Sequence, residues 1–323
     1  GVKNGKKVQA NDIPAVTQLF TPHWIVKYMV QNSLGRLWLN SKTSSKLKDK
    51  MEFYIEDSNN PENETGLLKI HNPEEIKFCD PCCGSGHILT YAFDLLYEIY
   101  SEEGYAPNAI PLLIITKNLF GIEIDERAAT LAAFALTMKA REKNPAWFKQ
   151  NISPQICLLK NIKLEQEEIE NYMEHCGRDL FTCNMERMLY QFEFADTFGS
   201  LIIPYEQNIA ELTTELEKKN FTDNLFLELI HKKVLQILKQ ADFLSSKYQV
   251  VVTNPPYLNK GMNDLLSNYL KDNYPDFKYE TIGGFAGTGK TFLISIIRKA
   301  INDKWNSSIR IAFATFTGKA SSV

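Results

Sequence analysis

Residues 76–87 read IKFCDPCCGSGH, and this stretch decides the fold. Its first four residues form a short apolar run that is typical of a buried strand, and a turn with two glycines follows at residues 80–86. A helical pattern then runs from residue 87 to about residue 100. A strand that passes through a glycine turn into a helix is the opening unit of a sheet with alternating strands and helices.

The same alternation continues along the chain. The predicted strands lie at residues 119–124 and 154–159, and the predicted helices at residues 126–141, 163–176 and 206–241. Residues 249–253 read QVVVT, a β-branched run that suits a strand buried on both faces of a parallel sheet. We therefore expect an α/β fold, namely an open, doubly wound, Rossmann-like sheet that is incomplete, followed by a short C-terminal P-loop α/β fragment.

Two segments upstream of this unit have local signals of their own. Residues 20–29 read FTPHWIVKYM, and their spacing predicts a helix with Thr21 as N-cap and Pro22 in the first helical position. Residues 41–73 are rich in Ser, Lys, Asn and Glu, and we interpret them as a loop insertion within the first domain.

The composition is that of a folded protein with a sizeable core. The 323 residues are enough for about two domains of roughly 150 residues each. Hydrophobic residues make up 44% and charged residues 23%, which excludes a disordered tail or a collagen-like repeat. The net charge of −3 does not by itself indicate a nucleic-acid partner, and no apolar run approaches the ~18–20 residues of a membrane span.

Cysteine usage is ordinary and favours a reducing compartment. The chain has six cysteines and no secretory signal, so we expect a cytoplasmic protein. No metal site is expected at Cys79, Cys82 and Cys83, because no second pair of ligands at suitable spacing accompanies them.

The ends of the first two predicted strands carry the first candidate site. In an open α/β sheet, ligands bind at the carboxyl ends of the strands, and a glycine turn lets the backbone approach them closely. Gly84 and Gly86 suit that purpose, and Asp80 can receive a cationic group of the ligand. Glu123 is placed to hold both ribose hydroxyls of a nucleoside. The alternatives are a purely structural turn and a carboxylate that caps the next helix, a role that fits Asp125 better than Glu123.

Residues 250–257 read VVVTNPPY and carry the second candidate site. A residue before a proline is held extended, so the backbone of Asn254 and Pro255 has a fixed course. Pro255 and Pro256 lack an N–H, so the stretch presents hydrogen-bond acceptors. The Asn254 side-chain oxygen and the Pro255 carbonyl can accept from one exocyclic amine, and Tyr257 offers a ring on which a flipped base stacks. The alternative is a proline-stiffened turn after a strand.

Together these motifs resemble the S-adenosylmethionine-dependent DNA amino-methyltransferases of the gamma group, which methylate adenine N6. The closer likeness is to the large adenine methyltransferases of BREX phage-exclusion systems and related restriction–modification enzymes. The likeness covers about residues 15–277 and rests on four segments in the family's order: residues 20–28, 80–87, 121–125 and 254–275. Residues 1–277 are accordingly expected to be the N-terminal part of a methyltransferase domain.

The resemblance implies a function and assigns roles to residues. The protein would be a site-specific enzyme that methylates adenine in double-stranded DNA, alongside other defence-system subunits. The residues that would line the cofactor site are Phe20 and Thr21 at its methionine end, Asp80, Gly84 and Gly86 on its floor, and Glu123 at its ribose. The residues that would hold the target adenine are Asn254, Pro255, Pro256 and Tyr257. Either Asn161 or Asp196 would contact the cofactor's adenine, and Cys82 stands where the family usually has Ala.

The likeness stops near residue 277, and a different pattern follows. Residues 284–291 read GFAGTGKT and match the GxxxxGK[ST] loop that cradles phosphates at a helix N-terminus. Lys290 would reach the β and γ oxygens of ATP and Thr291 would ligate Mg²⁺. The glycines of the loop are Gly284, Gly287 and Gly289.

Residues 278–323, with a predicted strand at residues 309–314, thus resemble the start of a RecD-like superfamily 1 helicase. This pattern leaves two rival interpretations of the whole chain. One is a P-loop ATPase or DNA helicase whose upstream half only binds DNA. The other is an inactive fusion that binds cofactor or DNA without turnover.

Overall fold

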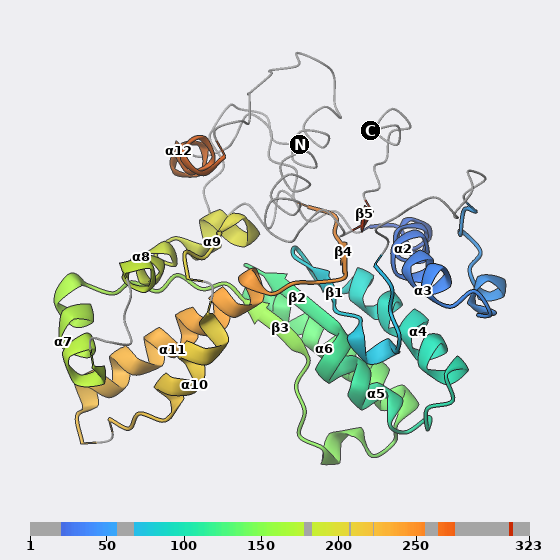
Figure 1. The fold of residues 1–323 in the computed structure, drawn as a ribbon, viewed down its shortest axis with the longest axis horizontal. Coiled ribbons are helices and arrows are strands. Elements are labelled where there is room, and N and C mark those ends of the chain that lie inside the picture. Colours follow the sequence, from blue (N-terminus) through green and yellow to red (C-terminus); the bar gives the residue numbers. More distant parts are fainter. Residues whose placement is uncertain are drawn as a thin grey trace. The chain divides into compact units, whose positions relative to one another are not determined.

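The computed structural model describes residues 21–56, 68–177, 183–206, 208–221, 223–255, 264–274 and 310–312 (Figure 1). The chain divides into two compact units. Unit 1 comprises Gly1–Ile156 and Lys247–Val323, and unit 2 comprises Cys157–Ser246.

A five-stranded sheet carries the elements predicted as strands. In chain order these are β1 (Phe78–Asp80), β2 (Leu119–Glu123), β3 (Gln155–Leu158), β4 (Val250–Val252) and β5 (Arg310–Ala312). Their order across the sheet is β3-β2-β1-β4-β5. β1 runs parallel to β2 and to β4, and β4 runs parallel to β5. The chain order therefore reverses between β1 and β4, and open α/β sheets bind their ligands at the carboxyl ends of strands at such a point.

The expected α/β class with a parallel sheet is confirmed. β5 falls within the predicted strand at residues 309–314 and pairs with β4 from Val250↔Arg310 to Val252↔Ala312. The P-loop fragment itself, with Gly284, Gly287, Gly289, Lys290 and Thr291, lies outside the described residues.

Unit 1 also contains α-helices among its described residues. They are α2 (His23–Val30), α3 (Arg36–Ser41), α4 (His87–Glu102), α5 (Ile110–Leu113), α6 (Glu126–Lys143) and α12 (Asp264–Asn273). α4 packs against α2 and α6 and against β1 and β2, and it buries Leu89, Phe93 and Leu96 completely. Burial of one side chain of this size stabilises the folded protein by about 1.5–3 kcal/mol. These side chains therefore hold α4 against the sheet, and α4 in turn holds the glycine turn that directly precedes it.

The first helix begins one residue later than the sequence predicts. Pro22, not Thr21, is the N-cap residue of α2, and the backbone N–H groups of Ile25 and Val26 donate to the Pro22 carbonyl. The prediction of Thr21 as N-cap is therefore wrong. The Thr21 hydroxyl oxygen instead accepts a hydrogen bond from Asn254, in a distant part of the sequence of unit 1.

The predicted loop insertion contributes to the core. Its described residues include a 3₁₀ turn at Leu47–Lys50, and a second 3₁₀ turn begins at its last residue, at Pro73–Glu75. Leu47, Met51 and Ile70 are each at most 5% exposed and belong to the core of unit 1. This segment thus lies on the domain rather than apart from it.

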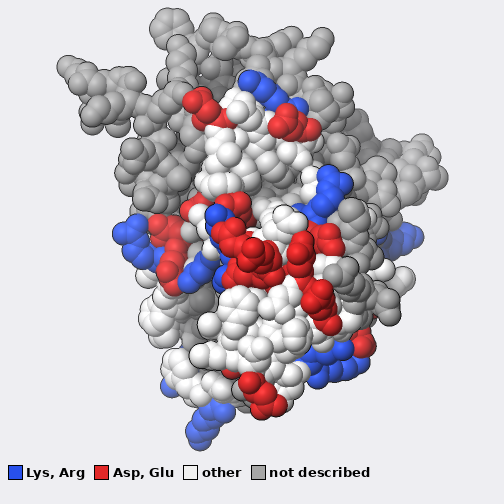
Figure 2. Space-filling model, turned by 90° about the vertical axis from the view of Figure 1, so that its left-hand side faces the viewer, with Lys and Arg blue, Asp and Glu red and all other residues white. Residues whose placement is uncertain are grey.

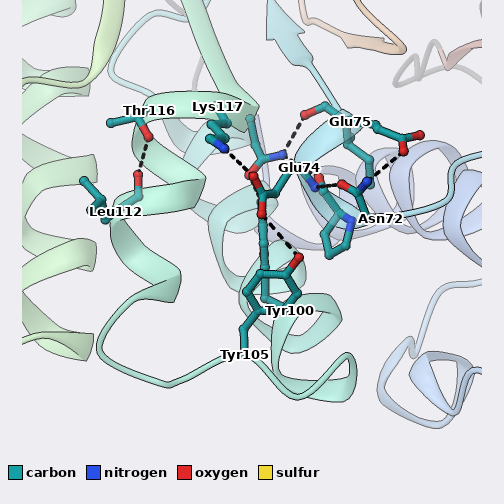
Figure 3. A network of polar contacts seen from close by, with 11 residues as sticks. Asn72, Glu74, Glu75, Tyr100, Tyr105, Leu112, Thr116 and Lys117 are labelled. Atoms are coloured by element: carbon teal, nitrogen blue, oxygen red, sulfur yellow. Dashed lines mark hydrogen bonds and ion pairs between the residues drawn. The ribbon is translucent and has the colours of Figure 1, made fainter.

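A polar network at the amino ends of β1 and β2 sets how these strands lie side by side (Figure 3). Asn118, which is fully buried before β2, donates to the Pro73 carbonyl ahead of β1 at 2.8 Å and accepts from the Tyr100 hydroxyl at 2.8 Å. Glu74 and Lys117 form an ion pair between the same two segments. These contacts hold the two strand starts together, and the strand register then places Asp80 beside Gly121 at the other end.

Unit 2 is helical. Its helices are α7 (Gln166–Cys176), α8 (Cys183–Gln191), α9 (Ala195–Phe198), α10 (Ile209–Glu217) and α11 (Leu225–Ser245). α11 packs against α7 and α10, and the buried Tyr172 hydroxyl bonds His231 Nδ1 at 2.5 Å. The predicted helix at residues 163–176 is confirmed, whereas residues 206–241 contain two helices instead of one, because Asn224 caps the start of α11.

Unit 2 is acidic. Residues 157–246 contain sixteen Asp and Glu and nine Lys and Arg, a net charge of −7, so the rest of the chain carries +4. Figure 2 shows acidic side chains gathered on one face of the molecule, and α7 alone carries four glutamates. None of the helices in the described parts of the chain is long and apolar enough to cross a lipid bilayer.

Candidate active site

Three neighbouring strands of the sheet bring the predicted site residues to one edge. Asp80 is the last residue of β1, Glu123 is the last residue of β2, and Asn254 follows β4 by two residues. Because β1 lies between β2 and β4 and runs parallel to both, Asp80 lies between the other two positions. The predicted grouping of Asp80, Glu123 and Asn254 thus has the topology that a common site requires.

Asp80 is a buried carboxyl at the centre of this edge. It is 1% exposed, and its Oδ1 accepts a hydrogen bond from the Cys82 N–H at 3.2 Å. Burial raises the pKa of Asp80 from 3.8 to about 7, and the nearby charge of Glu123 adds to the rise. The Thr253 hydroxyl approaches the carboxyl and lowers its pKa, although the contact falls outside the geometry of a normal hydrogen bond. Such a group is suited to receiving a cation.

The two glycines of the turn have different surroundings. Gly84 has a φ of +53°, and no atom of the described residues lies within 4 Å of the position that a Cβ would occupy. Gly86 has a φ of +84°, and a Cβ there would lie 3.1 Å from Ala132 of α6. Gly84 therefore leaves open space that a ligand can use. The need for glycine at residue 86 comes from its backbone conformation and the packing of α6.

Glu123 is held in place by three backbone N–H groups. Its Oε2 accepts from Gly84 at 2.7 Å, and its Oε1 accepts from Ile124 at 2.9 Å and from Asp125 at 3.0 Å. The carboxylate therefore ties the end of β2 to the glycine turn after β1. The helix-cap role belongs to Asp125, which accepts from the first turn of α6, as the alternative for that residue predicted.

The Asn254 side chain contacts Thr21, which lies near the start of the chain. Its Nδ2 donates to the Thr21 hydroxyl oxygen at 2.9 Å. Asn254 is half-buried and the following Pro255 is buried. Pro256, Tyr257 and Phe20, which were predicted to share this region, lie outside the described residues.

The two candidates for the cofactor's adenine contact, Asn161 and Asp196, are neighbours within unit 2. The Asn161 Oδ1 accepts a hydrogen bond from the Asp196 backbone N–H at 2.9 Å. The Asp196 carboxylate in turn accepts from the Thr197 hydroxyl at 3.1 Å. The choice between these two residues therefore becomes a choice within one polar cluster.

Two residues of the site were missed from the sequence. Thr253 is 2% exposed and places its hydroxyl at Asp80, and its signal was a polar residue at the end of an apolar strand. Gly121 lies beside Asp80 in the sheet, and a Cβ there would lie 2.6 Å from Ile156 and 2.9 Å from Leu89. Its signal was a glycine within a strand, which marks a close approach of neighbouring atoms.

Comparison with known proteins identifies relatives that share these segments. The family described as Eco57I restriction-modification methylase matches residues 117–286, and the MmeI DNA-methyltransferase domain matches residues 56–171. The adenine-specific methyltransferase BrxX of Escherichia coli O9:H4 (strain HS) is 39% identical over 317 residues, which cover 87% of this chain and 26% of BrxX. The adenine-specific methyltransferase PglX of Lacticaseibacillus casei (strain Zhang) is 35% identical over 297 residues, which cover 87% of this chain and 24% of PglX.

The chain thus spans about a quarter of the length of these two relatives. The Eco57I match includes Glu123 and Asn254, and the MmeI match includes Asp80 with its glycine turn. Nothing in these matches supports a helicase segment at residues 278–323. With more than half of its residues matched, the chain belongs to the Eco57I restriction-modification methylase family.

Proposed function

We propose that this protein transfers the methyl group of S-adenosylmethionine to N6 of adenine in double-stranded DNA. The methylase family match and two relatives named as adenine-specific methyltransferases support the proposal. The observation that carries it is the placement of Asp80, Glu123 and Asn254 at the carboxyl ends of three adjacent strands. Carboxylates suited to a cationic nucleoside and an amide suited to an amine thus share one edge of the sheet.

The residues of this edge fit the methyl donor. S-adenosylmethionine supplies an activated methyl group on a positively charged sulfur, and it also carries an ammonium and two ribose hydroxyls. A buried carboxyl with a raised pKa, such as Asp80, becomes ionised when a cation lies beside it. Glu123 offers about four acceptor positions, of which three backbone N–H groups of described residues use three, so one remains for a ribose hydroxyl. The open space at Gly84 lets the ligand approach the backbone.

Asn254 and Pro255 would hold the substrate amine. Their two oxygens accept both hydrogens of the adenine NH₂, which draws the nitrogen lone pair out of conjugation with the ring and directs it towards the methyl donor. Tyr257 would stack on the flipped base. The chain needs no covalent intermediate for this reaction, so its residues act by positioning and polarisation.

The charge distribution favours binding of the DNA by unit 1. Unit 2 carries −7, and an acidic surface repels the phosphate backbone, whereas the rest of the chain carries +4. We therefore expect the contacts that this chain makes to phosphate to come from unit 1.

The biological setting follows from the same likeness. A role in phage defence or restriction–modification, in the cytoplasm and together with other defence-system subunits, is part of the proposal. Binding of ATP and Mg²⁺ by residues 284–291 depends on the sequence pattern alone.

The proposal is tested by transfer of tritiated methyl groups from S-adenosylmethionine to unmethylated plasmid DNA. Wild-type protein is expected to label the DNA, and Asn254→Ala is expected to lose labelling while calorimetry shows nearly unchanged cofactor affinity. Asn108→Ala is the matched control, because Asn108 is exposed. Wild-type protein that binds no S-adenosylmethionine, or an Asn254→Ala variant that labels DNA as well as wild type, would contradict the proposal.

A further inference from the structure

Trp24 is an exposed tryptophan close to the carboxyl edge of the sheet. It is 57% exposed, whereas Trp38 and Trp147, the other tryptophans among the described residues, are at most 1% exposed. Tryptophan has a large apolar surface and is highly buried on average in folded proteins. The packing of unit 1 gives no reason for leaving this one indole in solvent, so a contact outside the fold is the better explanation.

The indole is carried by a rigid element that begins beside the candidate site. Trp24 lies in the first turn of α2, and the next two residues, Ile25 and Val26, are buried in the core. Thr21 precedes the N-cap of this helix, and its hydroxyl oxygen accepts from the Asn254 Nδ2 at 2.9 Å. Because three residues span at most roughly 11 Å, the backbone of Trp24 lies within that distance of Thr21.

The proposed reaction creates a place for an aromatic ring near Asn254. An adenine in duplex DNA must leave the base stack before its N6 can be methylated, and the bases on either side then lose a stacking partner. Proteins that open base steps frequently insert an apolar side chain between them. A distance of about 11 Å corresponds to about three base-pair steps, so a ring at residue 24 is within reach of the gap.

The first turn of α2 is compatible with DNA, because it contains no Asp or Glu that would repel phosphate. The other exposed Phe, Tyr and Trp side chains among the described residues of unit 1 are Phe134 and Phe148. Phe134 lies in the middle of α6, and Phe148 lies beyond its last turn. The 18 residues of α6 extend about 27 Å from the carboxyl end of β2, so Phe148 lies far from this edge.

We propose that Trp24 contacts DNA directly: its indole enters the base stack where the target adenine has left it, and it stacks on the base exposed there. This inference rests on the proposed function and adds the side chain that fills the gap. The inserted ring stabilises the flipped state, because it replaces part of the stacking that the adenine gives up. The contact suits any neighbouring base, since every base has a π-face.

The test measures the binding of two fluorescent duplexes of equal length and sequence by anisotropy. One is intact, and the other has a central tetrahydrofuran abasic site, so that the gap is present before binding and no adenine has to leave the stack. Wild type is expected to bind the abasic duplex about tenfold more tightly, roughly the effect of one stacked base. Trp24→Ala is expected to bind both duplexes equally, and Trp24→Tyr to retain part of the preference.

Phe148→Ala is the matched control, because it also removes an exposed aromatic side chain but at the far end of α6. It should keep the wild-type preference for the abasic duplex. A second measurement follows tryptophan fluorescence as the abasic duplex is added. Wild type should be quenched, and the quenching should be reduced in Trp24→Phe, because Trp38 and Trp147 are buried.

The outcomes separate this inference from the proposed function. Equal affinity of wild type for the two duplexes, or a wild-type preference in Trp24→Ala, would overturn the inference even if the protein methylates adenine. Loss of the preference in Phe148→Ala would overturn it too, because the effect would then not be specific to residue 24. The quenching experiment decides the question if Trp24→Ala folds poorly: quenching in Trp24→Phe equal to that of wild type would exclude the contact. Wild-type protein that binds neither duplex nor S-adenosylmethionine would overturn the proposed function, and the inference with it.

Discussion

Replacing Asp80 by asparagine is expected to stabilise the cofactor-free protein at neutral and alkaline pH. The Asp80 carboxyl is 1% exposed and its pKa is raised from 3.8 to about 7. Between these two values the folded protein keeps a proton that the unfolded chain has lost. The stability of the wild type therefore falls as the pH rises through this range, whereas an amide at residue 80 does not titrate.

The size of the effect follows from the two pKa values. Between pH 3.8 and about pH 7, each pH unit lowers the free energy of unfolding of the wild type by about 1.4 kcal/mol. At pH 8 the ionisation of Asp80 has therefore lowered it by roughly 4 kcal/mol. The asparagine oxygen can still accept from the Cys82 N–H, and the Thr253 hydroxyl is an acceptor near its new NH₂. Imperfect pairing of that NH₂ adds an offset that does not depend on pH, so the slope with pH is the decisive quantity.

The assay is denaturant unfolding of both proteins at pH 5, 6, 7 and 8. The free energy of unfolding of Asp80→Asn minus that of wild type should rise by about 1.4 kcal/mol per pH unit up to about pH 7 and then level off. Asp49→Asn, at an exposed position, should show no such slope. The same Asp80→Asn variant should bind S-adenosylmethionine more weakly at pH 8, because it cannot gain a charge. A difference in stability that stays constant from pH 5 to pH 8 would refute the argument.

Three further substitutions test other parts of the account. Asn254→Ala should abolish methyl transfer with little change in cofactor affinity, and retained methylation would remove Asn254 from its proposed role. Glu123→Gln should weaken cofactor binding by about 1–3 kcal/mol by calorimetry, since it removes a charged acceptor; equal affinity would exclude a ribose contact. Gly121→Ala should lower the free energy of unfolding by about 1–3 kcal/mol, because its Cβ would overlap Ile156. An unchanged free energy of unfolding in Gly121→Ala would contradict the overlap argument.

The predictable part of the site lies where local sequence and sheet topology agree. The run at residues 250–252 and the turn after Asp80 each have a short-range pattern, and parallel strands bring their carboxyl ends to one edge. This is why the grouping of Asp80, Glu123 and Asn254 could be predicted. Asp125 as the helix cap was equally local, because an N-cap depends on the next three residues.

The remaining features of the site depend on contacts between residues that are far apart in the sequence, and no local pattern indicates such contacts. Thr21 has the residue type of an N-cap and precedes a proline, yet its hydroxyl bonds Asn254, which lies far along the chain. At residue 86 the left-handed backbone already favours glycine, and the close approach of Ala132, which a separate helix brings to it, adds a requirement that the local sequence does not show. Tertiary packing thus contributes at both positions.

The most direct test of the central claim is to identify the atom that receives the methyl group. DNA incubated with the protein and methyl-labelled S-adenosylmethionine is digested to nucleosides and separated by chromatography with mass detection. The account predicts label in N6-methyldeoxyadenosine, with none when Asn254 is alanine. Label in a methylated cytosine, or unlabelled DNA from a protein that demonstrably binds both S-adenosylmethionine and duplex, would contradict it.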